Sequence, residues 1–255
     1  MTDFAHYPSL HDRAVLITGG GSGIGAALVE GFARQGAKVA FIDIAEEPSK
    51  ALAAKLSAQS AHPVVFYHAD LRDVGAIRNT VAAVESDLGA IRVLVNNAAW
   101  DDRHDIDTTT EEYWDNNQAI NLKQVFFVSQ AAAPGMRAAG GGAIINFSSI
   151  VFRMNPPALS SYATAKSGII GLTKSFAGRL GPENIRVNAV LPGMIVTERQ
   201  LELWLTEEGM AKTVERQCLK HVLKAADLVG PVLFLASDCS GSITAQAITV
   251  DGGIF

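Results

Sequence analysis

The sequence is poor in cysteine, in long apolar runs and in clusters of basic residues. Two cysteines among 255 residues are too few and too scattered for a disulfide framework or a zinc site, so we expect a reducing cytoplasm and no metal. The longest apolar runs fall far short of the roughly 20 residues that cross a bilayer, and residues 1–10 lack the features of a signal peptide. Lysine and arginine form no run and the formal net charge is −5, which argues against nucleic acid. These absences predict a soluble cytoplasmic protein without a membrane or nucleic-acid partner.

Short apolar runs rich in β-branched residues alternate with stretches of helical periodicity along the whole chain. Strands are predicted at Ala14–Thr18, Lys38–Asp43, Val64–Ala69, Ile91–Val95, Ala143–Phe147, Ile185–Val190 and Ala247–Val250. Helices are predicted at Gly23–Gln35, Glu47–Gln59, Val74–Leu88, Ser160–Leu180 and Thr110–Ala139, the last interrupted or kinked near Pro134.

Strands that are buried on both faces lose the alternation of polar and apolar residues, and these strands are continuously apolar. The pattern therefore predicts an α/β fold: a single Rossmann-type, doubly wound domain over residues 1–255, with a seven-stranded parallel sheet and helices on both faces. The stretch Thr197–Val222 is predicted as an insertion above the carboxyl ends of the strands, where open α/β sheets bind ligands and where it would act as a substrate lid.

A glycine-rich loop, Thr18–Gly25, connects the first predicted strand to the first predicted helix. Glycines in that position let the backbone approach a pyrophosphate, which then lies at the positive end of the helix. Asp43 ends the second predicted strand, where a carboxylate accepts the ribose hydroxyls of NAD and repels a 2′-phosphate. NAD is therefore favoured and NADP is the second option, while the alternative reading of Asp43 is a cap of the next turn. Asp70, after the third strand, would bond the adenine amino group or cap a helix.

Tyr162 and Lys166 lie one helical turn apart in the predicted helix Ser160–Leu180, so both side chains share one face. A free tyrosine has a pKa near 10 and is a poor base at neutral pH. An adjacent ammonium and the cationic ring of an oxidised nicotinamide would stabilise the phenolate. Lowering the pKa by about 3 units requires roughly 4 kcal/mol, which two cations in a shielded cleft can supply.

These motifs belong to an ordered series along the chain. The series is formed by Thr18–Gly25, Asp70-Leu71, Asn96-Asn97-Ala98-Ala99, Asn121, Ser148-Ser149, Tyr162 with Lys166, Pro192-Gly193 and Thr197. In its order and spacing the series resembles the short-chain dehydrogenase/reductase family over essentially the whole chain, with Ala99 standing where the family usually has glycine. The resemblance implies hydride transfer between NAD(P) and a hydroxyl or carbonyl group.

The resemblance also implies roles for individual residues. Tyr162 is the general acid/base, Lys166 lowers its pKa and holds the nicotinamide ribose, and Ser149, rather than Ser148, orients the substrate oxygen. Asn121 fixes a helix kink and a water that relays protons, or alternatively is a helix-surface amide. The implied cofactor-binding residues are Gly19, Ser22, Gly23, Ile24, Gly25, Asp43, Asp70, Leu71, Asn97, Ala98, Tyr162, Lys166, Pro192, Gly193, Ile195 and Thr197.

Four further segments resemble bacterial NAD-dependent sugar dehydrogenases of the D-xylose 1-dehydrogenase type. They are Tyr7-Pro8-Ser9-Leu10, Asp101-Asp102-Arg103-His104, Tyr113-Trp114-Asp115 and Gln217-Cys218-Leu219-Lys220. The resemblance implies oxidation of the C1 hydroxyl of an aldopyranose to a lactone. Ile150–Pro157 and Met194–Val196 differ from that type, so the sugar stays open among D-xylose, L-arabinose, D-galactose, L-fucose and L-rhamnose.

The candidate sugar contacts follow the fourth, fifth and sixth predicted strands, lie on the predicted catalytic helix, or belong to the insertion. They are Trp100, Asp102, Arg103, His104, Ser149, Asn155, Tyr162, Met194, Gln200 and Trp204. The alternative reading of Asp101–His104 is a solvated, self-paired charge cluster.

Other functions compete with the sugar hypothesis. A 3-oxoacyl carrier-protein reductase would have a basic residue in the glycine loop, where this chain has Ser22, and would lack Asp43. A polyol or steroid dehydrogenase would use the same catalytic residues, whereas a non-catalytic NAD-binding sensor would have lost the tyrosine or lysine. The apolar segments Val229–Ala236 and Ile248–Phe255 are predicted as interface material as well as core, and the family resemblance implies a homotetramer.

Overall fold

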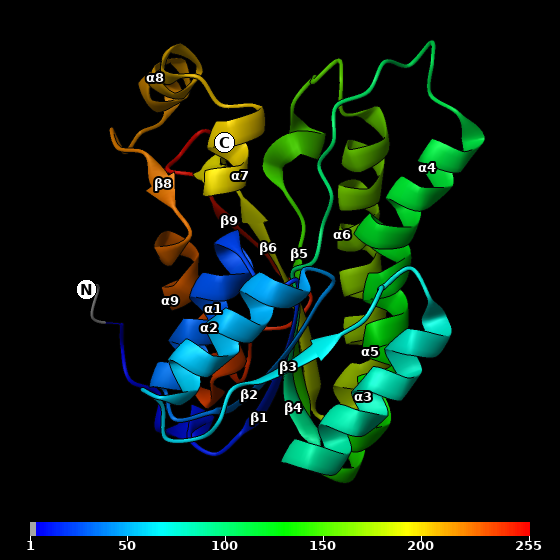
Figure 1. Cartoon of the computed structure of the whole chain (residues 1–255), viewed down its shortest axis with the longest axis vertical. Helices are drawn as coiled ribbons and strands as arrows, with labels where there is room; N and C mark the ends of the chain where they lie inside the picture. Colours follow the sequence, from blue (N-terminus) through cyan, green and yellow to red (C-terminus); the bar gives the residue numbers. More distant parts are fainter. Residues whose placement is uncertain (1–3) are drawn as a thin grey trace.

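The computed structural model describes residues 4–255 and has a seven-stranded parallel sheet at its centre (Figure 1). The strands follow the order β3-β2-β1-β4-β5-β6-β9 across the sheet. Their bounds are β1 Ala14–Thr18, β2 Lys38–Asp43, β3 Val65–His68, β4 Ile91–Asn96, β5 Gly142–Phe147, β6 Ile185–Pro192 and β9 Ala247–Val250. The order reverses between β1 and β4, because β1 pairs with β2 on one side and with β4 on the other. The predicted Rossmann-type, doubly wound fold is confirmed.

Helices cover both faces of the sheet, and each face has its own apolar core. The first layer is formed by α1 (Gly23–Arg34), α2 (Glu46–Ser57) and α9 (Ala226–Ala236), and the second by α3 (Val74–Leu88), α5 (Gln124–Ala138) and α6 (Ser160–Leu180) (Figure 1). Val15 and Ile17 belong to the first core and Leu16 to the second, because alternate residues of a strand point to opposite faces. Each such fully buried side chain contributes about 1.5–3 kcal/mol. Within residues 4–255, no helix combines the length and apolar character that crossing a bilayer requires.

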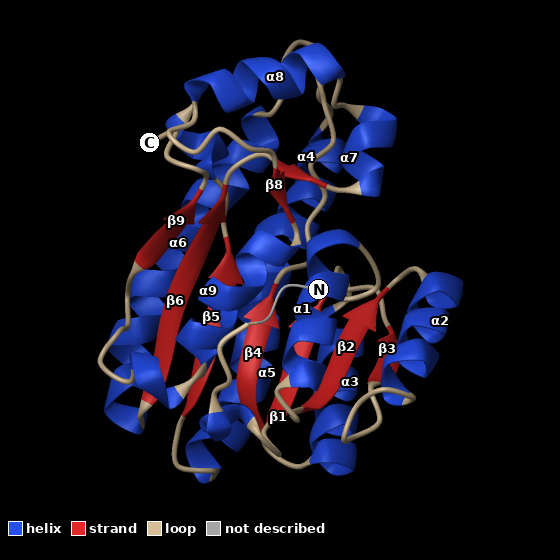
Figure 2. Ribbon diagram, turned by 90° about the vertical axis from the view of Figure 1, so that its left-hand side faces the viewer, coloured by secondary structure: helices blue, strands red, loops and turns tan. Residues whose placement is uncertain are grey.

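Beyond the carboxyl ends of the strands lies a layer formed by the late part of the chain (Figure 2). It contains α7 (Glu198–Leu203) and α8 (Glu207–Arg216), whose N-terminal caps are the hydroxyls of Thr197 and Thr206. Two short strands, β7 (Ile195–Val196) and β8 (Leu223–Lys224), pair with each other at the base of this layer. The insertion predicted at residues 197–222 therefore begins and ends at a small second sheet that the sequence analysis did not predict.

The long helical stretch predicted at residues 110–139 is interrupted, but not at Pro134. It consists of α4 (Glu111–Gln118), a π-helical turn at Ala119–Lys123, and α5, which continues through Pro134 to Ala138. Pro134 is exposed to solvent. The prediction of an interruption near Pro134 was wrong in position, because the irregularity lies at the π-helical turn, which includes Asn121.

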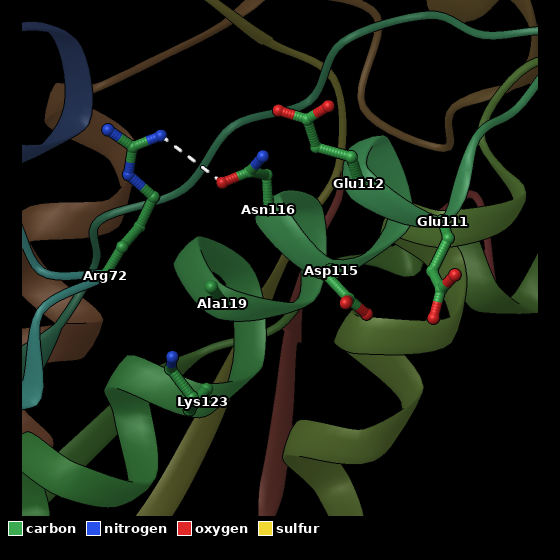
Figure 3. A pocket seen from close by; sticks show the side chains of 7 residues that line it. All are labelled: Arg72, Glu111, Glu112, Asp115, Asn116, Ala119 and Lys123. Atoms are coloured by element: carbon green, nitrogen blue, oxygen red, sulfur yellow. Dashed lines mark hydrogen bonds between the residues drawn. The ribbon is translucent and has the colours of Figure 1, made fainter.

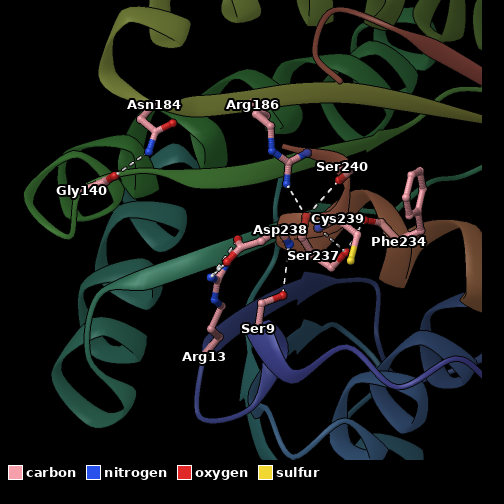
Figure 4. Close-up of polar contacts among 10 residues, drawn as sticks. All are labelled: Ser9, Arg13, Gly140, Asn184, Arg186, Phe234, Ser237, Asp238, Cys239 and Ser240. Atoms are coloured by element: carbon pink, nitrogen blue, oxygen red, sulfur yellow. Dashed lines mark hydrogen bonds and ion pairs between the residues drawn. The ribbon is translucent and has the colours of Figure 1, made fainter. Parts of the chain in front are cut away.

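At the amino ends of the strands, a group of polar contacts surrounds the end of α9 (Figure 4). The Arg186 guanidinium donates to the carbonyl oxygens of Leu235, at 2.8 Å, and Ser237, at 3.1 Å. These bonds satisfy carbonyls that a helix end leaves unpaired. Asp238 accepts two bonds from Arg13 and so ties the same corner to the start of β1. These bonds fasten the end of α9 to the starts of β1 and β6.

The two C-terminal segments predicted as core and interface differ in exposure. The helix α9 contributes Val232 and Leu233, both 0% exposed, to the first core, so Val229–Ala236 is core material. Ile248, on the edge strand β9, and Phe255 are 37% and 53% exposed.

Candidate active site

The glycine loop between β1 and α1 lies at the point where the strand order reverses. Gly19 has φ +66°, and a Cβ atom there would lie 2.7 Å from the Cα atom of Ala98. A Cβ atom at Gly25 would lie 1.8 Å from the carbonyl oxygen of Gly19. Glycine is therefore required at both positions, one by backbone conformation and both by the close approach of two chain segments. Ser22, the N-cap residue of α1, is exposed and makes no capping bond with its side chain within residues 4–255.

Asp43, at the end of β2, is bonded to the glycine loop. One carboxylate oxygen accepts the N–H of Gly21 at 2.8 Å, and the other accepts the N–H of Ala45 at 2.9 Å. Asp43 thus both holds the glycine loop and caps the turn before α2. Each oxygen keeps further lone pairs, so these bonds leave the carboxylate able to accept ribose hydroxyls.

Asn97 and Ala98, directly after β4, form the other wall of the loop. The Asn97 side-chain amide donates to the carbonyl oxygens of Thr18, at 3.1 Å, and Gly19, at 2.9 Å. The Thr18 hydroxyl accepts the backbone N–H groups of Asn97 and Ala98 at 3.0 and 3.1 Å. Thr18 was not among the predicted site residues, and its side chain holds β1 and β4 together under the loop.

Asp70 and Leu71 follow β3. Asp70 accepts the backbone N–H and the guanidinium of Arg72, which holds the pKa of the Asp70 carboxyl below its usual value. The N-cap of α3 is Asp73, whose carboxylate accepts from Gly75 and Ala76, so the reading of Asp70 as a helix cap was wrong. Leu71 is 4% exposed and packs in the second core.

Tyr162 and Lys166 lie on the first turns of α6 beside Ser149, which follows β5. The Ser149 side chain lies close enough to the Tyr162 phenol to lower its pKa. The Lys166 ammonium lies 5.4 Å from the centroid of the Tyr162 ring and donates to the carbonyl oxygen of Phe147 at 2.9 Å. Ser148 is buried, and its hydroxyl donates to the carbonyl oxygen of Lys166 at 2.7 Å. Of the two serines, Ser149 is therefore the one at the Tyr162 phenol.

The electrostatics of this group are set by burial and by Asp101. Burial, first, and the negative charge of Asp101 raise the pKa of the Tyr162 phenol, whereas Arg103 and Ser149 lower it. Burial lowers the pKa of the Lys166 ammonium to about 7, against the opposing effect of Asp101. In the protein alone the phenol is therefore a weaker acid than free tyrosine, and a phenolate needs further positive charge beside it.

Asn121 lies in the π-helical turn between α4 and α5 and is fully buried. Its side-chain oxygen accepts the N–H of Trp100 at 2.9 Å, and its side-chain nitrogen donates to the carbonyl oxygens of Trp100, at 2.8 Å, and Asn117, at 3.0 Å. The predicted alternative of a helix-surface amide was wrong, because this amide clamps the loop that follows β4.

The segment after β6 reaches the glycine loop. The Gly193 N–H donates to the carbonyl oxygen of Val250 at 2.9 Å, and Ile195 is buried in β7. The Thr197 methyl would contact a Cβ atom at Gly23 at 3.3 Å, so residue 197 borders the glycine loop. Pro192 ends β6, and Met194 is partly buried.

The loop after β4 contacts the layer above the strands. The Gln200 amide donates to the Asp101 carboxylate at 2.6 Å, and the Arg103 guanidinium lies 4.7 Å from the centroid of the Trp204 ring. Arg103 also donates to the carbonyl oxygen of Asp101 at 2.6 Å. Asp101 thus joins this loop to α7, and its negative charge acts on the Tyr162 phenol.

Three of the remaining predicted sugar contacts, Trp100, Asp102 and His104, lie near Tyr113. The Trp100 ring lies 5.6 Å from the Tyr113 ring, Asp102 is partly buried, and Asn155 is exposed. His104 hydrogen-bonds the start of α6 rather than Tyr162 itself. Within residues 4–255, no group of three or more His, Cys, Asp or Glu side chains is close enough to hold a metal ion.

A surface hollow of about 550 Å³ runs along α4 (Figure 3). Arg72 and Lys123 lie at one end of it, and Glu111, Glu112 and Asp115 lie along the helix. The hollow contains none of the predicted catalytic residues, so it is separate from the group around Tyr162.

Comparisons with known proteins cover nearly the whole chain. The model of the enoyl-(acyl carrier protein) reductase family matches residues 19–254. The chain is 61% identical over 251 residues to a probable galactose dehydrogenase of Rhizobium meliloti, with 98% of both chains covered. It is 49% identical over 249 residues to D-xylose 1-dehydrogenase of Caulobacter vibrioides, again with 98% of both covered. The structure of a gluconate 5-dehydrogenase from Burkholderia cenocepacia in complex with NADP and tartrate superimposes with a TM-score of 0.90 at 30% identity, covering 97% of each chain.

Proposed function

The chain belongs to the short-chain dehydrogenase/reductase family, and from that premise we propose that it is an NAD(P)-dependent aldose 1-dehydrogenase. Its substrate would be a pyranose sugar whose C1 hydroxyl is oxidised to the lactone. The observation that carries the proposal is the grouping of Tyr162, Ser149 and Lys166 at the same end of the parallel sheet as the glycine loop, in a chain 61% identical to a probable galactose dehydrogenase. Galactose is therefore the first sugar to test, and D-xylose the second.

The residues around the glycine loop fit a dinucleotide. The first N–H groups of α1 follow Ser22, whose side chain forms no capping bond in the described chain, so they are available to an anionic pyrophosphate. Asp43 would accept the adenosine ribose hydroxyls, and Asn97, Ala98 and Thr197 would border the nicotinamide side. When bound, the oxidised cofactor supplies a hydride acceptor and a positive charge beside the phenol.

Tyr162 would act as the general base of the oxidation. Its phenolate accepts the proton of the C1 hydroxyl as the hydride leaves C1, and Ser149 donates a hydrogen bond that orients the substrate oxygen. Because the pKa of the Tyr162 phenol is raised in the protein without cofactor, the phenolate needs a cation close to it to form. Lys166 would hold the nicotinamide ribose. Its buried side chain is anchored on the Phe147 carbonyl and, when protonated, would stabilise the Tyr162 phenolate.

The sugar's other hydroxyls need polar partners, and we propose that the loop after β4 and α7 supply them. Asp101 and Gln200 already hydrogen-bond each other, and Arg103 lies over Trp204. The Trp204 indole N–H is buried without a hydrogen-bond partner in residues 4–255, so a sugar hydroxyl would supply the acceptor it lacks. Movement of α7 and α8 about the small β7–β8 sheet would open and close this side of the cleft, as a lid does.

Asp43 supports a preference for NAD over NADP. A 2′-phosphate would approach a carboxylate already fixed by Gly21 and Ala45, and the two negative charges would repel. We expect Asp43→Ala to lower the kcat/KM ratio of NAD to NADP at least tenfold. An unchanged ratio would show that Asp43 does not read the ribose.

Two further expectations complete the proposal. The exposed apolar residues Phe126, Ile248 and Phe255 support a homo-oligomer, with a homotetramer expected, and light scattering of the purified protein measures its mass. The exposed, unpaired cysteines Cys218 and Cys239 favour a reducing cytoplasm, which cell fractionation tests.

The experiment that tests the function is NADH formation by purified protein with NAD and a panel of the five aldoses, with NADP as second cofactor and polyol, steroid and 3-oxoacyl substrates as controls. We expect rapid turnover of one or two sugars, and at least a thousandfold loss of kcat in Tyr162→Phe with NAD affinity within a few-fold. Turnover of only a polyol, steroid or 3-oxoacyl substrate would overturn the sugar assignment. NAD binding without any turnover would indicate a non-catalytic sensor.

A further inference from the structure

The helix that carries Tyr162 has no N-cap of its own. The N-cap position of α6 is Leu159, whose side chain cannot accept a hydrogen bond. The first N–H groups of a helix have no partner within the helix, and an uncapped first turn frays. Tyr162 lies in that first turn, directly after Ser160 and Ser161. The position of the phenol therefore depends on whatever else accepts these N–H groups.

His104, in the loop after β4, supplies the missing acceptor. Its Nε2 atom accepts the backbone N–H of Ser161 at 3.2 Å and lies 2.8 Å from the Ser160 hydroxyl oxygen. A backbone N–H can only donate, so Nε2 is unprotonated and the ring proton is on Nδ1. Nδ1 lies 3.1 Å from the hydroxyl oxygen of Tyr113, to which it donates. Both ring nitrogens are thus occupied by bonds that fix the tautomer.

The cap is itself held on two sides. The His104 backbone N–H donates to the carbonyl oxygen of Ala158 at 3.1 Å, which ties the loop to the segment entering α6. The His104 ring centroid lies 5.0 Å from that of Tyr113, on α4. Because α4 and α6 pack side by side (Figure 1), the ring is confined between the two helices.

The same turn of α6 is bonded to α4 through Ser161. The Ser161 hydroxyl donates to the side-chain oxygen of Asn117 at 3.0 Å, and the Gln118 amide donates to the carbonyl oxygen of Ser161 at 2.9 Å. Asn117 in turn accepts from Asn121. The N-terminal turn of α6 is therefore part of a continuous set of hydrogen bonds that reaches Asn121. Within the described residues, the only acceptor for the Ser161 N–H is His104.

We propose that His104 is a positioning residue that caps the helix carrying Tyr162 from a distant segment, rather than a residue that binds the sugar. The proposal rests on the proposed function, because its kinetic consequence is expressed in sugar oxidation. Loss of the cap lets the first turn of α6 fray and moves the phenol relative to Ser149 and Lys166. The chemical step then slows, while the sugar contacts made by other residues stay in place.

Two substitutions at residue 104 separate a cap from a sugar contact. His104→Phe keeps a ring of similar size and removes both nitrogens, whereas His104→Gln keeps an acceptor that can reach the Ser161 N–H. We expect His104→Phe to lower kcat about tenfold with the sugar KM within twofold, and His104→Gln to recover kcat to within threefold of the wild type. A raised KM with unchanged kcat in both variants would overturn the cap and identify a sugar contact.

Tyr113→Phe provides a milder variant, because it removes only the acceptor of the Nδ1 proton and leaves both rings. We expect a two- to threefold decrease in kcat and no change in KM. An unchanged kcat would show that the fixed tautomer does not matter and would count against the proposal.

Amide hydrogen exchange at residues 160–166, measured on the NAD-bound protein, tests the cap without turnover. We expect exchange at Ser161 and Tyr162 to be at least tenfold faster in His104→Phe than in the wild type, and near the wild-type rate in His104→Gln. Equal rates in all three proteins would overturn the proposal. If the wild type oxidises no sugar, the proposed function fails on its own, and the exchange rates still decide whether His104 caps α6.

Discussion

Replacement of Lys166 by methionine tests the burial of charge at the centre of the site. Lys166 is 2% exposed, and its ammonium donates to a neutral carbonyl. Burial lowers its pKa from 10.5 to about 7. Between these values the unfolded chain holds a proton that the native protein does not, so stability rises with pH across this window. At about 1.4 kcal/mol per pKa unit, the cost of burying this lysine is on the order of 4–5 kcal/mol at pH 7, and about 2 kcal/mol of it is relieved by pH 9.

The assay is urea unfolding of the cofactor-free protein at pH 7 and pH 9. Lys166→Met keeps an unbranched side chain of similar length and removes the titrating group, and Lys174→Met, at an exposed position of the same helix, is the matched control. We expect the wild type and Lys174→Met to share one pH dependence. The unfolding free energy of Lys166→Met should rise less between pH 7 and pH 9, by about 2 kcal/mol. The same rise in all three proteins would refute the assignment of a depressed pKa to Lys166.

Two further substitutions test the glycine loop and the buried polar network. Gly25→Ala would force a Cβ atom to within 1.8 Å of the Gly19 carbonyl oxygen, so we expect NAD affinity to fall at least tenfold by calorimetry, whereas Gly178→Ala, with open space around it, should leave affinity unchanged. Thr173→Val removes the hydroxyl that accepts a 3.0 Å hydrogen bond from the buried Asn146 amide, and we expect urea unfolding to show a loss of about 1–3 kcal/mol. Unchanged stability in Thr173→Val would indicate that the Asn146 amide finds another acceptor.

The central strands could be predicted almost to the residue because their pattern is unambiguous. Ala14–Thr18 is a run of five buried residues between polar segments, and β1 has those bounds. The edge strand β3 is shorter than predicted, Val65–His68 rather than Val64–Ala69, because it pairs only with β2 and its ends lack a second neighbour. The sequence pattern shows only which residues are apolar, whereas the ends of a strand depend on which residues pair with the neighbouring strand.

The remaining features depend on contacts between distant segments, which the sequence pattern does not encode. The strands β7 and β8 have two residues each, too few to show any period. Pro134 is a general helix breaker, yet its ring lies at an exposed position of α5, and the helix continues. His104 was predicted as a sugar contact from its place in a polar loop, and only the structure shows both of its nitrogens bonded to α4 and α6 residues.

The π-helical turn at Ala119–Lys123 also sets the rotational phase between α4 and α5. Each residue of a regular α-helix advances the direction of the side chains by about 100°, and a π turn accommodates one additional residue. Ahead of the turn, Asn117 is directed at the first turn of α6, and beyond it Val128 is directed into the second core. In a regular α-helix one inserted residue would rotate the faces on either side of it by about 100° relative to each other, and the π-helical turn absorbs that rotation. Asn117 can therefore face α6 while Val128 packs in the second core, so this five-residue turn couples the alignment of the Tyr162 helix to the packing of the sheet.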